Sequence, residues 1–159
     1  MKTCIILLLS LLLLFACNDS PNSSTDDMNK DILERLLAVE NLSVSEISPK
    51  NGFPRQFEVY IRQPLDHNNP DGSQFEQRIY ISHKNDNSPV LFMPSGYSST
   101  PVKTCELAEP LGANQIYAAH RFMMGARPAD LNWQFLTAEQ ASADFHRVVE
   151  VLKTVYNGP

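Results

Sequence analysis

Two short apolar runs, separated by a glycine-containing turn, constrain the fold of this chain more than any other feature. Residues 90–93 (Val-Leu-Phe-Met) favour a buried strand, and small, turn-forming residues occupy positions 94–100. A short helical segment is expected next, before a second apolar run, residues 115–119, that ends in His120 and Arg121. Strand, turn, helix and strand in this order form the unit of a parallel sheet, whose functional loops lie at the carboxyl ends of its strands. The sequence therefore predicts an α/β fold with a functional rim after these two strands.

Two further strands are predicted upstream of this unit. Phe57, Val59 and Ile61 alternate with polar residues, which indicates a half-buried strand. Residues 75–82 repeat this alternation, and the segment between the two, residues 64–72, is rich in Asp, Asn and Pro. Strands joined by such a turn are most simply antiparallel, so a hairpin is expected. Residues 90–93 are apolar on both faces, so they are expected to form a central parallel strand.

The clearest helix is expected from Ala138 to Tyr156. Thr137 and Gln140 match a capping box at its start, and Asn157-Gly158 matches a helix end. Asp144 and Arg147 are expected to pair on the exposed side. One apolar face is formed by residues at three- and four-residue steps: Ala141, Phe145, Val148, Val149, Leu152 and Val155.

The amino terminus is typical of a bacterial lipoprotein signal. Lys2 precedes an apolar run, residues 5–14, that is far shorter than the roughly 20 residues of a membrane-spanning helix. The run ends in Leu14-Phe15-Ala16-Cys17, the pattern in which Cys17 is lipidated and becomes the mature amino terminus. We therefore expect a signal peptide at 1–16 and a polar, flexible tether at 17–27, in an exported, membrane-anchored protein at the periplasm or cell surface. The alternative is an ordinary signal peptide in which Cys17 is incidental.

Residues 28–159 are expected to form one modest domain. It should begin with a helix at about 28–39, capped by Asp26 or Asp27, followed by a proline-containing linker. Removing residues 1–16 from the 159 residues takes away Lys2, so the formal charge changes from −5 to −6. A mildly acidic chain without a basic cluster is a poor candidate for binding nucleic acid.

Cysteines and histidines offer no metal site or internal disulfide. Cys4 would be lost with the signal peptide and Cys17 would carry lipid, so only Cys105 remains. Cys105 lies in the expected helical segment, residues 102–107, and is predicted to be a small packed side chain. The four histidines are far apart, with no second ligand at metal-binding spacing. No metal site is therefore expected.

The turn after residues 90–93 is the nearest match to the serine-hydrolase nucleophile motif G-x-S-x-G. Gly96-Tyr97-Ser98-Ser99-Thr100 lacks the second glycine. The turn also follows the third expected strand, where a hydrolase fold has an oxyanion donor and not its nucleophile. Three interpretations stay open: Ser98 as nucleophile, the Gly96-Tyr97 backbone as oxyanion contributor, or a plain tight turn.

The remaining candidate side chains have structural alternatives as well. His120 and Arg121 could line a site at the strand end, or they could hydrogen-bond adjoining loops. His67 is expected to be structural within the hairpin turn, and His146 to lie on an exposed helix face. Trp133 is expected to pack a loop onto the core.

Taken together, the motifs resemble the amino-terminal part of the secreted bacterial prolyl tripeptidyl-type serine aminopeptidases (PS-10-like). These are relatives of lysosomal Pro-Xaa carboxypeptidase and dipeptidyl peptidase II. The resemblance covers residues 57–159 and consists of five motifs in order: Gln63-Pro64-Leu65-Asp66-His67, Phe75-Glu76-Gln77-Arg78, Pro94-Ser95-Gly96, His120-Arg121-Phe122-Met123-Met124-Gly125, and Leu136-Thr137-Ala138-Glu139-Gln140 with Ala143-Asp144.

The resemblance implies an α/β-hydrolase core with a helical cap, acting on peptide amino termini, often beside proline, without metal or cofactor. It assigns Gly96 and Tyr97 to the oxyanion side of the site and His120 and Arg121 to a supporting loop. It supplies no catalytic serine, aspartate or histidine, which the family has beyond the position of Pro159. The expectation is therefore an incomplete α/β-hydrolase sheet and an inactive fragment of a serine exopeptidase. The alternative is a non-catalytic surface lipoprotein that acts as a binding module.

Overall fold

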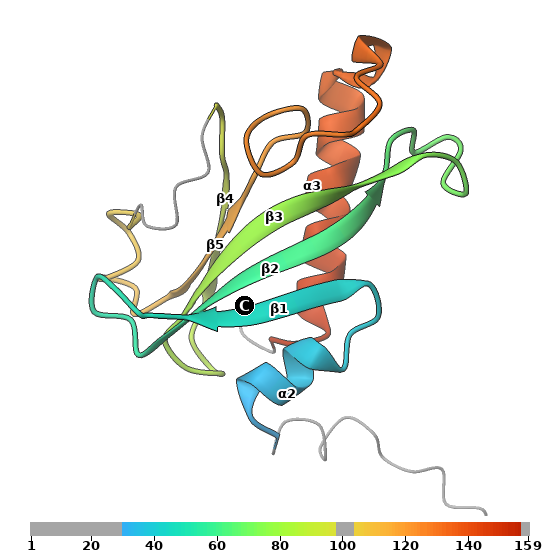
Figure 1. Cartoon of the computed structure of the whole chain (residues 1–159). Coiled ribbons are helices and arrows are strands. Elements are labelled where there is room, and N and C mark those ends of the chain that lie inside the picture. Colours follow the sequence, from blue (N-terminus) through green and yellow to red (C-terminus); the bar gives the residue numbers. More distant parts are fainter. Residues whose placement is uncertain (1–29, 98–103, 157–159) are drawn as a thin grey trace, which may run out of the picture.

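The structure, a computed structural model, describes residues 30–97 and 104–156 (Figure 1). A five-stranded sheet carries a long helix across one face and a short helix at the β1 end (Figure 1). The mixed α/β architecture predicted from the sequence is confirmed. The elements in chain order are α2 (Ile32–Leu37), β1 (Leu42–Ile47), β2 (Arg55–Pro64), β3 (Gln74–His83), β4 (Val90–Pro94), β5 (Asn114–Ala118), a 3-10 helix (Trp133–Phe135) and α3 (Ala138–Lys153).

The helix expected at about 28–39 is shorter in the structure, where α2 covers Ile32–Leu37, and an unexpected strand follows it. The side chain of Asp31 caps α2 by accepting a hydrogen bond from the Leu33 amide at 2.9 Å. The predicted caps, Asp26 and Asp27, lie outside the described residues. β1 pairs antiparallel with β2 where only a linker was predicted. Its serines alternate with apolar residues, a weak strand signal that becomes a strand because β2 offers an edge to pair with.

The predicted hairpin is confirmed. β2 and β3 pair antiparallel over their whole length, with Val59 opposite Ile79. Phe57, Val59 and Ile61 are at most 1% exposed and face the helices. The alternation of apolar and polar side chains therefore decided which face of this hairpin is buried, as the period of two requires.

The parallel unit has the predicted strands in a different arrangement. The sheet order is β1-β2-β3-β5-β4, so β5 lies between β3 and β4 and pairs parallel with β4. β4, predicted to be central, is at the end of the sheet within the described part of the chain. It is also the fourth strand along the chain, because the sequence analysis missed β1. All five residues of β5 are buried, whereas four of β4 are only half-buried.

The helix expected at residues 102–107 is not present in the part of this segment that is described. Residues 106–112 form turns, closed by a bond from the Ala108 amide to the Cys105 carbonyl at 2.9 Å and one from Gly112 to Glu109 at 3.0 Å. Pro110 disfavours helical geometry at the residue before it, and Gly112 adopts a positive φ of 57°. Cys105 is half-buried and is not in a disulfide.

α3 covers the sheet and completes the core. It begins at the predicted cap, where the Thr137 side chain accepts a hydrogen bond from the Gln140 amide at 3.2 Å. It ends at Lys153, three residues earlier than predicted. The core unites both helices with one sheet face: Ile32, Leu36, Phe57, Val59, Ile61, Ile79, Ile81, Ile116, Ala118, Val148, Leu152, Val155 and Tyr156.

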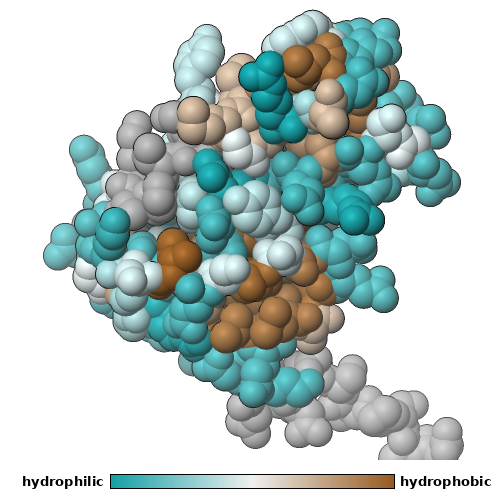
Figure 2. Space-filling model, viewed as in Figure 1, coloured by the Kyte–Doolittle hydropathy of each residue, from teal (hydrophilic) through white to brown (hydrophobic). Residues whose placement is uncertain are grey.

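The two faces of the sheet differ in polarity. The face toward the viewer in Figure 2 is mainly hydrophilic, and apolar side chains gather below it, over α2 and the neighbouring part of β1. On the hydrophilic face the Tyr80 hydroxyl donates to Glu58 at 2.8 Å, and burial together with this bond raises the pKa of Tyr80 to about 12.

A helix that spans a membrane has to be both long and predominantly apolar. None of the helices within the described residues is long and apolar enough to cross a membrane. The predicted signal peptide, tether and Cys17 lie outside the described residues.

Candidate functional site at the carboxyl ends of β4 and β5

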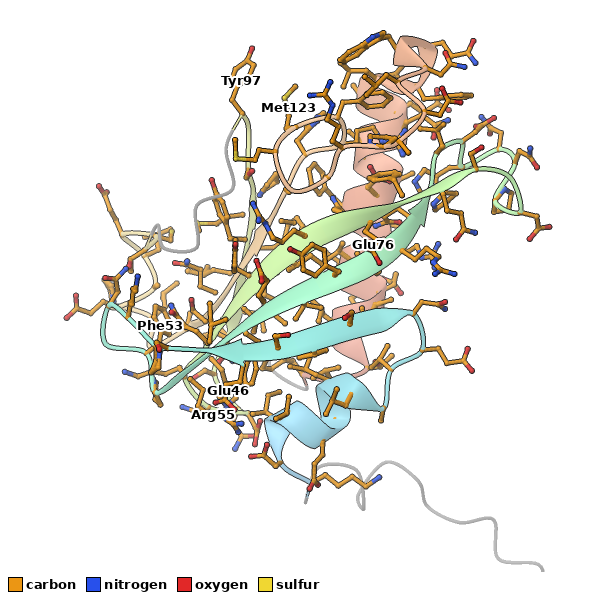
Figure 3. The ribbon with its side chains drawn as sticks, in the orientation of Figure 1. Glu46, Phe53, Arg55, Glu76, Tyr97 and Met123 are labelled. Carbon is orange, nitrogen blue, oxygen red and sulfur yellow. The ribbon has the colours of Figure 1, made fainter. Side chains whose placement is uncertain are left out.

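The carboxyl ends of the two parallel strands meet, as the sequence predicted. Pro94 lies opposite Ala118 in the β4–β5 register, and the Ser95 amide donates to the Ala118 carbonyl at 2.7 Å. The segments that leave these strands, residues 95–97 and 119–126, therefore start side by side; we call them the carboxyl edge. Figure 3 shows Tyr97 and Met123 together at this end of the sheet. In open α/β sheets this is where ligands bind.

Gly96 and Tyr97, the predicted oxyanion contributors, lie on the outer part of this edge. Tyr97 is 88% exposed, and its ring points away from the sheet (Figure 3). A Cβ atom built on Gly96 would have no neighbour within 4 Å, so the described residues leave open space beside this backbone. Ser98, the alternative nucleophile, lies outside the described residues. The oxyanion role of Gly96 and Tyr97 stays a prediction.

Arg121 is buried beneath the carboxyl edge. Its guanidinium is 0% exposed and forms two bonds with the equally buried carboxylate of Asp144, from Nε to Oδ2 at 2.7 Å and from Nη2 to Oδ1 at 2.8 Å. Asp144 was expected on the exposed side with Arg147, and this prediction was wrong. The helical pattern placed Asp144 next to exposed positions, but the guanidinium compensates its charge in the interior.

The remaining guanidinium donors of Arg121 bind three carbonyl groups. Nη1 donates to Leu65 O at 2.9 Å and to Phe135 O at 2.8 Å, and Nη2 donates to Pro64 O at 3.2 Å. Arg121 therefore joins the hairpin turn, the 3-10 helix and α3 to the loop after β5. This arrangement agrees with the structural alternative given for Arg121 in the sequence analysis, in which it hydrogen-bonds adjoining loops.

Two more side chains, those of His67 and Gln140, hold the hairpin turn in place. His67 Nε2 lies 2.7 Å from Asp144 Oδ1, so His67 has the structural position that was expected. The Gln140 side chain accepts from the His67 amide at 2.9 Å and donates to Asp66 Oδ1 at 2.9 Å. The capping box is thus only half realised, because Thr137 caps α3 while the Gln140 side chain binds the turn.

Two glutamines extend these contacts to the backbone of the carboxyl edge. Gln63 Nε2 donates to Gln77 Oε1 at 2.8 Å and to the Asp144 carbonyl at 3.0 Å. Gln77 Nε2 donates to the Ala119 carbonyl at 2.6 Å. Sequence reasoning missed both, although each falls on the inward face of a strand that is otherwise apolar there. We call this set the buried polar network: Gln63, His67, Gln77, Arg121, Gln140 and Asp144.

His120 faces the helix side of the sheet. Its Nδ1 donates to the Arg121 carbonyl at 2.9 Å, and its ring packs edge-on against Phe145 at 5.9 Å between centroids. Phe145 in turn contacts Phe92 of β4 at 5.8 Å. The imidazole is thereby fixed in orientation by β4, α3 and its own loop.

A second buried cluster lies at the opposite ends of the parallel strands. Arg35 pairs with Asp86 and donates to the Val155 carbonyl at 2.8 Å, which ties α2 to the end of α3. His83 Nδ1 lies 3.2 Å from the Tyr156 hydroxyl. Burial lowers the pKa of the His83 imidazole, against an opposing effect of Asp86, and burial raises the pKa of Tyr156. This cluster is remote from the carboxyl edge and joins secondary-structure elements.

The carboxyl edge can supply backbone N–H groups as hydrogen-bond donors and a binding surface whose loop after β5 is held in place. The printed sequence offered no metal pattern, and no group of three or more His, Cys, Asp or Glu side chains suited to a metal ion is found among residues 30–97 and 104–156. The buried polar network fixes the loop after β5 from below. Such preorganisation is what an active-site wall requires.

Comparison with known proteins identifies relatives of this chain. The family described as PS-10 peptidase S37 matches residues 25–158. A prolyl tri/tetrapeptidyl aminopeptidase from Streptomyces mobaraensis is 36% identical over 127 residues. These residues are 79% of this chain and 26% of the relative, so the chain spans about a quarter of the length of that protein.

Proposed function

This chain belongs to the PS-10 peptidase S37 family, and from that premise we propose that it supplies the amino-terminal part of the catalytic domain of a serine exopeptidase. One observation carries the proposal: in a chain of this family, the carboxyl ends of β4 and β5 meet next to Gly96 and Tyr97. The buried polar network fixes the loop that follows β5 at this edge. The proposed activity is removal of prolyl tri- or tetrapeptides from peptide amino termini, the activity that the relative's name states.

The proposed fold is an α/β-hydrolase sheet that continues beyond β4. Its support is an apolar groove of 180 Å³ between β4 and α3. β4 is apolar on both faces yet only half-buried, which suits a strand that gains another neighbour. A strand that follows α3 would reach this edge by a right-handed crossover. The groove is lined by Val90, Phe92, Ile116, Val149, Leu152, Lys153 and Tyr156.

In the proposed mechanism the catalytic serine, base and acid come from the later part of the family's fold. The serine hydroxyl attacks the scissile carbonyl while the histidine takes its proton, and the carbonyl oxygen becomes an oxyanion. The backbone N–H of Tyr97 is the proposed donor to this oxyanion, beside the amide that follows the serine. Because β4 is the fourth strand, this assignment depends on the position of Tyr97 at the carboxyl edge and no longer on counting strands.

The proposed location is an exported, lipid-anchored protein. The support is the Leu14-Phe15-Ala16-Cys17 pattern together with a family match that starts at residue 25, near the end of the expected tether and well after Cys17. A Cys17→Ser variant should lose incorporation of labelled palmitate and leave the membrane fraction. Membrane association and labelling that survive Cys17→Ser would contradict the lipid anchor.

The peptidase proposal can be tested with a chimera. The 127 aligned residues of the Streptomyces mobaraensis enzyme are replaced by those of this chain, and release of aminomethylcoumarin from Ala-Ala-Pro-aminomethylcoumarin is measured. The chimera should hydrolyse the substrate, whereas the 159-residue chain alone should not. A folded but inactive chimera contradicts the proposed peptidase role. Inhibitor-sensitive hydrolysis by the chain alone contradicts the proposed location of the catalytic groups.

A second candidate function uses the same groove differently. In a non-catalytic surface lipoprotein, another polypeptide would cover the apolar face that β4 and α3 present. The coding sequence downstream of Pro159 separates the two candidates. A frame that encodes a short apolar strand followed by G-x-S-x-G supports the peptidase, and an unrelated region supports the binding module.

A further inference from the structure

A stacked aromatic pair stands on the carboxyl edge. The rings of Phe122 and Trp133 lie 5.2 Å apart between centroids with an interplanar angle of 29°. Phe122 is 5% exposed, whereas Trp133 is 57% exposed. The phenyl ring thus supports the indole from below, and much of the indole surface remains open to solvent.

The loop that carries Phe122 holds an unfavourable backbone conformation. Phe122 has a φ of 64°, in the left-handed region that a bulky aromatic residue rarely adopts. The loop is closed by bonds from the Phe122 amide to the Ala126 carbonyl at 2.8 Å and from the Ala126 amide to the Met123 carbonyl at 2.9 Å. Arg121, the residue before Phe122, is itself held in place by its buried ion pair with Asp144. Strain that the surroundings maintain in this way is concentrated at functional sites.

The carboxyl edge carries further exposed apolar side chains besides Trp133. Of the six large hydrophobic residues that are most exposed in the described part of the chain, Tyr97 and Met124 lie on the carboxyl edge and Trp133 stacks on it. Figure 3 shows Tyr97 and the neighbouring Met123 side chain at the same end of the sheet. Exposed apolar groups gathered at a ligand-binding edge indicate a binding surface.

We propose that the open face of Trp133, supported by Phe122, binds the prolyl ring of a peptide substrate and so determines specificity. This inference rests on the proposed peptidase function and assigns a subsite to it. The pyrrolidine ring of proline is compact and apolar, and aromatic side chains bind it well because its conformation is already restricted. A pre-stacked indole loses little freedom on binding, since Phe122 already holds its orientation.

Trp133 is the only tryptophan of the chain, so its fluorescence reports on this site alone. The 159-residue chain is titrated with Ala-Ala-Pro-amide and, as matched ligand, Ala-Ala-Gly-amide. The prolyl peptide should produce a saturable change in Trp133 emission, and the glycyl peptide should bind about fivefold more weakly, as expected for loss of one ring contact. No saturable change with the prolyl peptide, or equal affinity for the two peptides, would overturn the proposal.

Three variants distinguish specific binding of the prolyl ring at Trp133 from non-specific binding to exposed apolar side chains. In saturation-transfer NMR on the proline ring protons, Trp133→Phe should retain the signal and Trp133→Ser should lose it. Leu111→Ser, at a residue with 51% exposure in the β4–β5 connection, should leave the signal unchanged. Since Trp133 is exposed, these substitutions leave the core intact, which circular dichroism checks. A Trp133→Ser variant that transfers saturation as the wild type does would refute the assignment.

Different experimental outcomes would overturn the Trp133 subsite and the peptidase proposal. Binding of Ala-Ala-Pro-amide needs no catalytic group. An active chimera in which Trp133→Ser leaves the KM for prolyl substrates unchanged overturns the subsite alone. A folded, inactive chimera together with selective binding at Trp133 overturns the peptidase role alone.

Discussion

Arg121 and Asp144, 23 residues apart in the sequence, form a two-bonded ion pair in which both side chains are 0% exposed. One residue leaves the carboxyl end of β5 and the other lies in the first half of α3. The pair therefore couples the loop of the candidate site to the helix that covers the sheet. The guanidinium N–H groups of Arg121 that do not bind the carboxylate donate to three backbone carbonyls.

Breaking this pair from one side should be costly. Asp144→Leu leaves the Arg121 guanidinium buried without its counter-charge, and we expect the free energy of unfolding to fall by about 3–5 kcal/mol. The double variant Arg121→Met/Asp144→Leu should lose less than Asp144→Leu does, because no uncompensated charge remains. Urea unfolding followed by circular dichroism measures both. Glu150→Gln, at the exposed pair with Lys153, is the control and should leave the unfolding midpoint unchanged.

His83 should make stability depend on pH. Burial lowers the pKa of its imidazole in the folded chain, although Asp86 acts in the opposite direction. The unfolded chain therefore binds a proton more readily below pH 6.5. The free energy of unfolding should fall as the pH falls from about 6.5, by at most about 1.4 kcal/mol per pH unit. From about one pH unit above 6.5 both states carry neutral His83, and its contribution to stability is constant.

The pH prediction is checked by urea unfolding between pH 5 and pH 7.5. His83→Gln should flatten the dependence, because the amide does not titrate. His146→Gln, at an exposed position on α3, should retain it. Asp31, Glu46 and Glu150 have lowered pKa values and titrate below this range. A slope that survives in His83→Gln would assign the effect to another group.

Gln140 should protect the hairpin turn and not the helix end. In Gln140→Ala the His67 amide loses its 2.9 Å acceptor, so its hydrogen exchange should accelerate by about tenfold, which corresponds to one ordinary hydrogen bond. Thr137→Ala removes the cap of α3, and it should accelerate exchange at the Gln140 amide while leaving His67 protected. Equal effects of both variants at His67 would contradict separate roles for the Gln140 side chain and the Thr137 cap.

The backbone of Tyr97 can be tested apart from its side chain. In the active chimera, Tyr97→Pro removes the amide N–H proposed to hold the oxyanion, and kcat should fall about a hundredfold or more. Tyr97→Phe keeps the amide and removes only the hydroxyl, so kcat should stay near the wild-type value. Steady-state kinetics with Ala-Ala-Pro-aminomethylcoumarin distinguishes the two. A large loss of kcat in Tyr97→Phe would transfer the role to the phenol.

Much of the fold could be predicted because its signals are local. Phe57, Val59 and Ile61 alternate with polar residues, and a strand with that pattern buries one face in any surrounding. Val148 and Leu152 recur at helical spacing in the same way. β1 escaped prediction because Ser43 and Ser45 weaken its pattern, and only the β2 edge makes it a strand. The position of β4 beside β5 depends on long-range pairing, which the sequence of β4 does not encode locally.

The candidate site was predictable in location but not in composition. The strand–turn–strand order pointed to Gly96, Tyr97, His120 and Arg121, and these residues do lie at one edge of the sheet. Gln63 and Gln77 could have been suspected, because a polar residue on an inward strand position needs a partner. Nothing local to Trp133 indicated that it would stack on Phe122, since that contact depends on the course of an irregular loop.

The amino-acid sequence by itself determined the two strands of the hairpin, the two apolar strands that follow, the long helix and the family, because periodicity and ordered motifs act over short stretches of chain. Only the tertiary structure decided that Asp144 is buried. A carboxylate enters the interior when a counter-charge and hydrogen-bond partners are present there, and these come from Arg121 and His67 on other elements. A helical pattern cannot contain that information. It shows which residues share a face of the helix, but not which side chains of other elements contact that face.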